Sequence, residues 1–289
     1  MFVIVGATGN TGRVAAETLL AAGQKVRVVV RSADAAAAWK EKGAEAAVAT
    51  LADAGALEAA FRGATGVYFL VPPDVRSEDY LGQARRYTEN AARALVAAGV
   101  PHVVLLSSVG AHQAAGTGPI ASVREAEQVF SQVPDLARTF LRPSYFLDNW
   151  ASALPVAKAQ GVLPTFLPVG LTIPQIATVD IGRAAARALL DPPARGETRV
   201  VDLVGAVDAS ANDIAKAVSD LLGKPVAAVE QPLDAIVATF QSFGMSAHLA
   251  GLYREMLEGI LNGTVAYPAG AQLVRGQEGP REALAPLLG

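Results

Sequence analysis

The chain of 289 residues is long enough for one large domain or two ordinary ones, and 52% of its residues are hydrophobic. Its 24 basic and 27 acidic residues give a net charge of −3, which excludes the basic excess typical of nucleic-acid-binding proteins. The absence of cysteine excludes disulfides, thiolate nucleophiles and cysteine metal ligands. The N-terminus lacks the pattern of a signal peptide, and no run of about 18 apolar residues occurs, so we expect a cytoplasmic protein without a membrane segment.

The first 150 residues alternate between short apolar runs and Ala/Leu-rich stretches that end at glycine. We expect strands at residues 2–5, 25–30, 46–49, 67–71, 102–106 and 138–141. We expect helices at residues 12–22, 33–41, 56–62, 80–98 and 122–132. This alternation predicts an α/β fold of the Rossmann type, a doubly wound parallel sheet with right-handed crossovers. The strands lack polar alternation, which indicates that helices cover both faces.

The pattern is weaker after residue 150. Residues 161–175 carry three prolines and are predicted to form a loop. Helices are expected at 181–190, from Ser210 onward, at 233–244 and at 247–261, with one strand at 200–204. Asp213 stands at the capping-box position of the helix that Ser210 begins. We therefore expect a Rossmann domain at 1–150 and a smaller, mostly helical lobe at 151–289, partly interleaved with the sheet.

A glycine-rich motif, Gly-Ala-Thr-Gly-Asn-Thr-Gly, connects the first predicted strand to the first predicted helix. Gly6 permits a tight turn, Gly9 lets the backbone approach a pyrophosphate, and Gly12 lets the helix pack closely on the strand. The helix N-terminus offers unpaired N–H groups and a positive dipole end to phosphates. This context favours a dinucleotide site over a glycine-rich turn without a ligand. The predicted contacts are Gly6, Thr8, Gly9, Asn10, Thr11 and Gly12.

Arg31 follows the second predicted strand, 19 positions after Gly12. NAD sites usually carry Asp or Glu near this point to bind the ribose 2′-hydroxyl, whereas a cation suits a 2′-phosphate. The sequence therefore predicts NADP(H) rather than NAD(H) as the cofactor. The alternative is that Arg31 is a solvated residue at the end of a strand.

Three further predicted strands end in residues suited to a ligand site. Val71 and Pro72 follow the fourth strand, Ser107 and Ser108 follow the fifth, and Pro143 ends the sixth. The carboxyl ends of parallel strands form the crevice in which ligands of such sheets bind. We expect Val71, Pro72, Ser107 and Pro143 beside the cofactor, and Ser108 on the substrate side.

Four segments together resemble the NmrA-like group of atypical short-chain dehydrogenases. They are VGATGNTG at 5–12, AGVPHVVLLSS at 98–108, TFLRPSYFLDN at 139–149 and TVDIGRAA at 178–185. The C-terminal tail at 276–289 resembles the group's last helix, so the resemblance covers nearly the whole chain. It implies a Rossmann fold that binds NADP(H). The group includes NADPH-dependent quinone reductases, triphenylmethane dye reductases and NmrA itself, a regulator that binds dinucleotide without turnover.

The chain departs from the ordinary short-chain dehydrogenases in one respect. No Tyr-x-x-x-Lys pair follows Ser107 and Ser108 to protonate a carbonyl. Reductases of this group often have Lys or His four residues before a helix Glu. Glu127 matches that Glu, but the earlier position holds Val123, which cannot transfer a proton. A general acid must lie elsewhere, or none is needed. We expect Glu127 to be structural, pairing with Arg142 or holding a helix in place.

Two residues are candidate proton donors. Tyr145 follows the turn at 141–143 and has a hydroxyl that suits a substrate oxygen, although a place in a pocket wall or the core is the alternative. His112 lies in the loop after the fifth strand, and histidine is the usual proton donor at neutral pH, although loop histidines are more often solvated. Arg124 is a candidate ligand for an anionic substrate, or simply an exposed residue.

A second set of residues is expected to line the substrate side, and the alternative for its aromatic members is a core position. The predicted lining is Ser108, Phe146, Asn149 and Trp150, with Phe166 as a further aromatic candidate. No His, Asp or Glu residues have metal-ligand spacing, so no metal is expected. No Gly-x-Ser-x-Gly elbow occurs, which argues against a serine hydrolase.

The leading hypothesis is an NADPH-dependent oxidoreductase that transfers hydride to a quinone-like or aromatic dye-like acceptor. Such an acceptor takes hydride without an obligate acid, because the product is a stabilised anion or a neutral molecule. The second hypothesis is an NADP(H)-binding redox sensor without turnover, which Val123 also fits. An epimerase that uses bound NAD transiently is disfavoured by Arg31 and by the missing Tyr-x-x-x-Lys. A small aromatic substrate is the expected partner, and the sequence leaves a monomer and a homodimer open.

Overall fold

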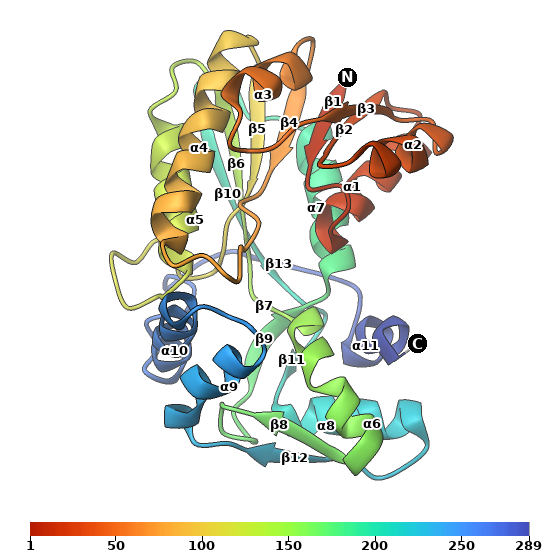
Figure 1. Cartoon of the computed structure of the whole chain (residues 1–289), viewed down its shortest axis with the longest axis vertical. Helices are drawn as coiled ribbons and strands as arrows, with labels where there is room; N and C mark the ends of the chain where they lie inside the picture. The colour runs from red at the N-terminus through yellow and green to blue at the C-terminus, as the bar shows by residue number, and fades with distance from the viewer. Residues whose placement is uncertain (289) are drawn as a thin grey trace.

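The computed structural model describes residues 1–288, and an eight-stranded parallel sheet forms its centre (Figure 1). The strand order is β13-β10-β6-β5-β4-β1-β2-β3. The strands are β1 (Phe2–Val5), β2 (Val26–Val30), β3 (Glu45–Val48), β4 (Gly66–Phe69), β5 (His102–Leu106), β6 (Ala137–Pro143), β10 (Thr198–Val204) and β13 (Leu273–Arg275). The order reverses at β1, which places a ligand crevice at the carboxyl ends of the central strands.

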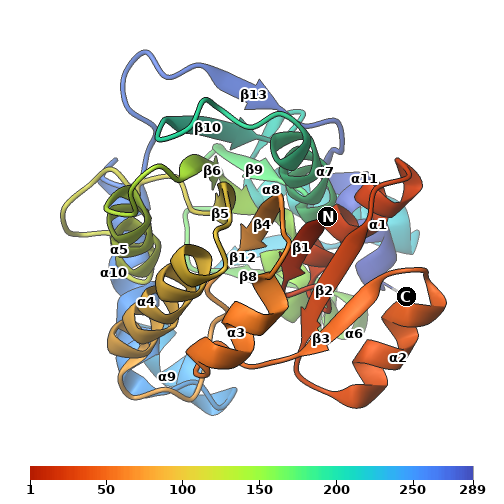
Figure 2. The ribbon, with the colours of Figure 1, turned by 90° about the horizontal axis from the view of Figure 1, so that it is seen from above.

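Helices cover both faces of the sheet, as a doubly wound fold requires (Figure 2). One face carries α1 (Asn10–Ala21), α2 (Ala33–Glu41) and α7 (Thr178–Leu190), whose apolar side chains pack on Ile4, Val28 and Leu141. The other face carries α3 (Ala54–Phe61), α4 (Tyr80–Ala97) and α5 (Ile120–Ser131), which pack on Val5, Phe69 and Phe140. Both faces are therefore apolar core, and the predicted fold class is confirmed.

The remaining elements form a second part of the molecule, drawn below the sheet in Figure 1. They are β7 (Tyr145–Phe146), the 3-10 helix η1 (Leu147–Ser152), α6 (Leu154–Gln160), β8 (Val162–Thr165), β9 (Ile173–Ile176), β11 (Asp208–Ala209), α8 (Ala211–Leu222), β12 (Ala227–Glu230), the 3-10 helix η2 (Leu233–Ala235), α9 (Ile236–Ser242), α10 (Ala247–Leu261) and α11 (Pro280–Leu288). Ser210 and Asp213 form the predicted capping box at the start of α8. None of the helices in residues 1–288 is long and apolar enough to cross a bilayer.

The prediction of a loop at 161–175 is wrong. This segment contains β8 and the beginning of β9, and two of its prolines lie inside strands. Pro164 pairs with Val229 in a two-stranded sheet, and Pro174 pairs with Asp208. Each proline has a partner on one side only, because β8 pairs with β12 alone and β9, which lies between β11 and β7, pairs with β7 only from Gln175 onward. A position with one open side tolerates proline, since the missing N–H can face away from the ladder.

The chain after residue 150 also completes the main sheet. β10 pairs with β6 and β13 pairs with β10, both parallel, while α7 packs on the face that α1 covers. Residue 150 itself lies inside η1. The sheet and the lower part are thus interleaved along the sequence. A boundary at residue 150 does not separate them, because β10, β13 and α7 come after it and belong to the sheet and its helical cover.

His102, the first residue of β5, is a buried histidine, and its Nε2 lies 3.1 Å from the Thr139 hydroxyl. Burial, with a contribution from the Arg199 cation, lowers its pKa to about 4. The folded state therefore binds fewer protons than the unfolded state, so stability is lost as pH falls from about 6.5 to about 4. We expect a loss of about 3 kcal/mol in the free energy of unfolding from this group over that window.

Urea unfolding at pH 7, 5.5 and 4.5 tests this expectation with the wild type and the His102→Gln variant. The variant lacks the titrating ring, so its stability should fall less steeply over the same window. Equal pH slopes for the two proteins would contradict the assignment.

Candidate functional site

The glycine loop (residues 6–12) has the geometry predicted for a phosphate-binding turn. Gly6 has a φ of +72°, and the carbonyl oxygen of Gly6 accepts a hydrogen bond from the N–H of Gly9 at 2.9 Å. A Cβ on Gly12 would lie 2.4 Å from the Gly6 oxygen and 3.1 Å from the Ala7 nitrogen. No side chain fits between the start of α1 and the end of β1, so glycine is required at position 12.

The first turn of α1 has no internal partner for its N–H groups. Gly9 is the N-cap and supplies no side-chain acceptor, and the first turn contains no acidic residue. Asn10, the first residue of α1, is exposed, as are Thr8 and Gly9 before it, so an anion can approach the start of the helix from solvent. Unpaired N–H groups at the positive end of a helix form a site for phosphate.

Two polar side chains of the loop are already bonded within the protein. The buried Thr11 hydroxyl accepts a hydrogen bond from the Tyr68 hydroxyl at 2.9 Å, and the Asn10 amide donates to Asp148 Oδ1 at 3.0 Å. We therefore expect Asn10 and Thr11 to contact a dinucleotide through their backbone N–H groups. Thr8 is exposed.

Arg31 lies at the edge of the sheet that carries the glycine loop. β1 and β2 are paired in parallel with Val5 opposite Val29, so both strands end on this edge. Arg31 is exposed and forms no ion pair within residues 1–288. The next residue, Ser32, caps α2 by accepting from the Ala35 N–H at 3.3 Å. The guanidinium is free to bind an anion beside the glycine loop.

The predicted contacts at the ends of the other strands divide into two groups. Val71 is half-buried and Pro72 is exposed, and both follow β4 at the edge that carries the glycine loop. The side chains of Ser107 and Pro143 are buried instead. The Ser107 hydroxyl donates to Glu127 Oε1 at 2.5 Å and so faces α5. Contact between these two residues and a cofactor stays a prediction.

Glu127 and Arg142 form the predicted pair, and the structure confirms it. Arg142 Nε lies 2.8 Å from Oε1 of Glu127, and its terminal nitrogen lies 2.6 Å from Oε2. Both side chains are nearly buried, and the hydrogen bond to Glu127 raises the pKa of Arg142. A carboxylate held in this way orients Ser107 and is not free to serve as a proton donor. Val123, one turn earlier on α5, is half-buried.

Tyr145 belongs to a group of three tyrosines from distant parts of the chain. Tyr80 begins α4, Tyr145 lies on β7 and Tyr253 lies on α10. Burial, with the proximity of the other two hydroxyls, raises the pKa of Tyr253 to about 12, and burial also raises the pKa of Tyr145. The ring of Tyr253 packs edge to face on that of Phe240, with 5.6 Å between the ring centroids, and Phe240 packs in the same way on Phe166, with 6.0 Å between centroids. We call Tyr80, Tyr145 and Tyr253 the tyrosine cluster.

Sequence reasoning found Tyr145 but missed Tyr80 and Tyr253. Their helices have no motif that marks a site, and both residues lie far from Tyr145 in the sequence. The Tyr80 hydroxyl also lies 3.3 Å from the Ser122 hydroxyl on α5. The cluster thus joins the elements after β4, β5 and β6.

The other predicted substrate-side residues take different positions. Trp150 is buried in the core of the lower part, where its indole N–H donates to Gln175 Oε1 at 2.8 Å, so its place on the substrate side stays a prediction. Phe146 is half-buried against the core on the α1 face, while Ser108 is half-buried and Asn149 is exposed. His112 is exposed and lies near Asp202. Burial raises the pKa of Asp202, and the nearby Arg142 and His112 partly offset this increase.

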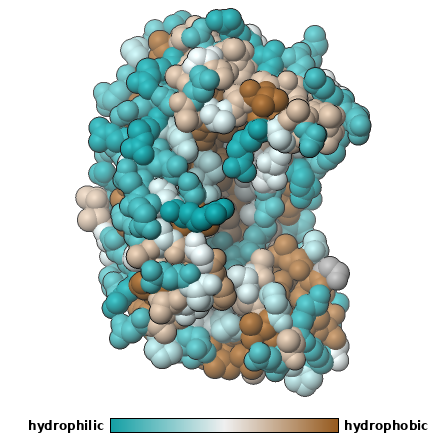
Figure 3. All heavy atoms as spheres, viewed as in Figure 1, coloured by the Kyte–Doolittle hydropathy of each residue, from teal (hydrophilic) through white to brown (hydrophobic). Residues whose placement is uncertain are grey.

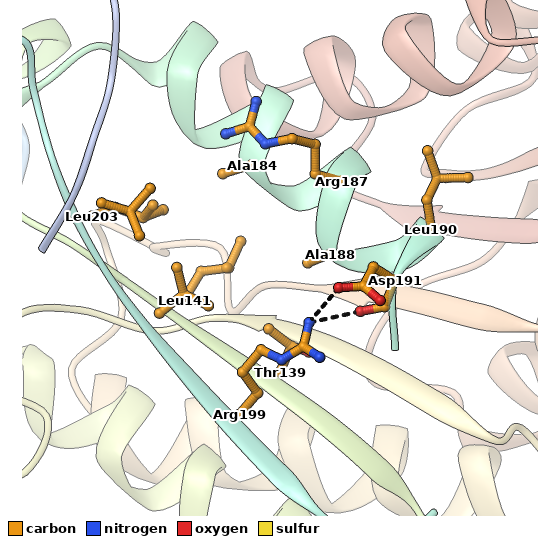
Figure 4. A pocket seen from close by; sticks show the side chains of 11 residues that line it. Thr139, Leu141, Ala184, Arg187, Ala188, Leu190, Asp191, Arg199 and Leu203 are labelled. Carbon is orange, nitrogen blue, oxygen red and sulfur yellow. Dashed lines mark hydrogen bonds and ion pairs between the residues drawn. The ribbon is translucent and has the colours of Figure 1, made fainter. Parts of the chain in front are cut away.

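Two hollows are distinguishable on the molecule. Figure 3 shows its face hollowed between the sheet and the lower part, where the carboxyl ends of the strands lie. A separate cavity of about 410 Å³ lies between α7 and the strands β6 and β10. There the Arg199 guanidinium donates to the carbonyl and the carboxylate of Asp191, both at 2.9 Å (Figure 4). The glycine loop and the tyrosine cluster do not line this cavity, so we do not assign it to the site.

Comparisons with known proteins agree with this geometry. The NmrA-like family model matches residues 1–259. The NAD(P)H azoreductase of Xenophilus azovorans is 28% identical over 259 residues, covering 89% of this chain and 86% of its own. The NADPH-dependent quinone oxidoreductase of Escherichia coli, solved with NADPH, superposes with a TM-score of 0.83 at 22% identity and 100% coverage of both chains. The triphenylmethane reductase of Citrobacter sp. gives a TM-score of 0.82 at 18% identity and 99% coverage of both. Because the family model matches residues 1–259 of the 289, this chain belongs to the NmrA-like family.

Proposed function

We propose that this protein is an NAD(P)H-dependent reductase that prefers NADPH and passes hydride to a quinone-like or aromatic dye-like acceptor. The observation that carries the proposal is the pairing of an uncapped α1 N-terminus with a free Arg31 on the same edge. Its relatives support the reaction class, because they include an azoreductase and fold neighbours that are quinone and dye reductases.

The residues divide the work between binding and positioning. NADPH, when bound, supplies the hydride. The backbone amides of the glycine loop hold its phosphates, and Arg31 holds the 2′-phosphate. The tyrosine cluster offers apolar ring faces to a flat acceptor and excludes water from it. Tyr145, a phenol that is protonated at neutral pH, donates a hydrogen bond to an acceptor oxygen, and His112 is the second candidate donor.

Cofactor preference is tested by replacing Arg31 with aspartate. A carboxylate would repel the 2′-phosphate and accept from a 2′-hydroxyl, so we expect NADPH affinity to fall about 10- to 100-fold while NADH affinity holds or rises. Dissociation constants for both dinucleotides measure the ratio directly. Arg62→Asp, an equal charge change at an exposed arginine on α3's end, is the control. If the ratio of the NADPH and NADH dissociation constants were unchanged in the Arg31 variant, Arg31 would not determine the cofactor preference.

The second candidate function is an NADP(H)-binding sensor without turnover. It is favoured by the bonding of Glu127 to both Arg142 and Ser107, which leaves α5 without a free acid or base at this site. NADPH oxidation with a panel of quinones, azo dyes and triphenylmethane dyes separates the two. Turnover with any of these classes supports the reductase. Tight NADPH binding with no oxidation across the panel supports the sensor.

A further inference from the structure

We propose that Asp148 is a positioning residue that holds the glycine loop in the shape that binds the pyrophosphate. This inference rests on the dinucleotide site of the proposed function and extends it to a residue outside the glycine motif. Asp148 lies in η1 and not in the first strand-turn-helix unit, which carries the glycine loop.

The Asp148 carboxylate bridges two helix N-termini. Its Oδ1 accepts the Asn10 amide at 3.0 Å and the Thr178 hydroxyl at 2.7 Å, and its Oδ2 accepts the Thr178 N–H at 3.2 Å. Asn10 is the first residue of α1, and Thr178 is the first residue of α7. A carboxylate at a helix N-terminus is stabilised by the free N–H groups and the positive dipole end.

The helix α7 is held in place by burial and by hydrogen bonds. Its residues Ile181 and Ala185 are completely buried under the sheet, and Asp180 accepts the N–H groups of Gln277 and Glu278 at 2.9 Å. α1 crosses α7 in backbone contact, since a Cβ on Gly182 would lie 2.7 Å from the Thr11 oxygen. The two helices lie side by side in both ribbon views (Figures 1 and 2).

The bridge determines what the Asn10 side chain does. Because its amide donates to Asp148, it neither caps its own helix nor folds over the first-turn N–H groups. Without the carboxylate, the exposed segment Thr8–Asn10 loses the hydrogen bond to Asp148 that links it to Thr178 of α7, and ligand binding must then order the segment. Preorganisation of this kind raises the affinity for the dinucleotide, because a loop that is already ordered loses less entropy on binding.

The test measures NADPH dissociation constants by calorimetry for Asp148→Ala, Asn10→Ala and the double variant. We expect about tenfold weaker binding for Asp148→Ala, and no further loss when Asn10→Ala is added to it. Binding of 2′-AMP, which carries the 2′-phosphate but no pyrophosphate, should be unchanged. Asp53→Ala, which removes the N-cap acceptor of α3 from the Ala56 N–H, is the matched control and should bind NADPH as the wild type does.

Each outcome decides the inference. Asp148→Ala within twofold of the wild type, or additive losses in the double variant, overturns it while leaving the proposed function standing. A wild type that does not bind NADPH overturns both. Asn10→Ala tests the same contact from an exposed position, so a fold defect in Asp148→Ala leaves the question decidable. A purely structural role for Asp148 would lower the unfolding midpoint in all variants at this site without the selective loss of pyrophosphate binding.

Discussion

Replacing Gly12 with alanine is expected to weaken NADPH binding by at least about 100-fold. The new Cβ would lie 2.4 Å from the Gly6 carbonyl oxygen and 2.8 Å from its carbon, distances that backbone atoms cannot accommodate. α1 must move away from the end of β1, and its first-turn N–H groups move with it. Two or more charge-assisted hydrogen bonds to phosphate would be lost, each contributing about 1.5–3 kcal/mol.

Two other glycine variants calibrate this result. Gly251→Ala adds a Cβ in α10 with nothing within 4 Å, so NADPH binding should be unchanged. Gly9→Ala brings a Cβ to 3.3 Å from the Gly6 oxygen, and we expect a smaller loss than for Gly12→Ala. Calorimetry gives the dissociation constants, and circular dichroism checks that each variant is folded. A folded Gly12→Ala protein that binds NADPH within threefold of the wild type would show that the site lies elsewhere.

The features that could be predicted from the sequence are local ones. A turn between β1 and α1 needs glycine at fixed spacings, and those spacings are visible in residues 6–12. The helix at 33–41 and the strand at 102–106 match α2 and β5, because apolar periodicity and terminal glycines act within one element. The pair of Glu127 with Arg142 was also predicted, as one of two structural roles for Glu127, and the structure shows it.

The features that could not be predicted depend on segments distant in sequence. The prolines of 161–175 suggested a loop, yet Pro164 finds a partner strand in β12, more than 60 residues further along the chain. The tyrosine cluster and the Asp148 bridge have the same origin. Ser107 shows a related limit: its position after β5 was correct, but its hydroxyl turns toward Glu127, and only the packing of α5 determines that direction.

Removing the Glu127 charge is expected to have the largest effect on stability. Glu127→Leu would leave the Arg142 guanidinium nearly buried, with 13% of its side chain exposed and without its carboxylate partner. Breaking a buried pair on one side costs about 3–5 kcal/mol, because the remaining charge is desolvated and unpaired. Ser107 would also lose the acceptor that it contacts at 2.5 Å. Urea denaturation at pH 7 gives the free energy of unfolding for comparison with the wild type.

The double variant Glu127→Leu/Arg142→Met tests whether the two side chains stabilise the protein as a pair or independently. Replacing both charges with apolar side chains of similar volume removes the desolvation cost, so the double variant should be more stable than Glu127→Leu alone. Asp220→Asn, which disrupts the exposed pair with Lys216, should change stability by less than about 1 kcal/mol. If the double variant were as unstable as the sum of its single variants, the two side chains would be acting separately. In that case the bidentate contact would not be what holds α5 against β6, and the orientation of Ser107 would need another cause.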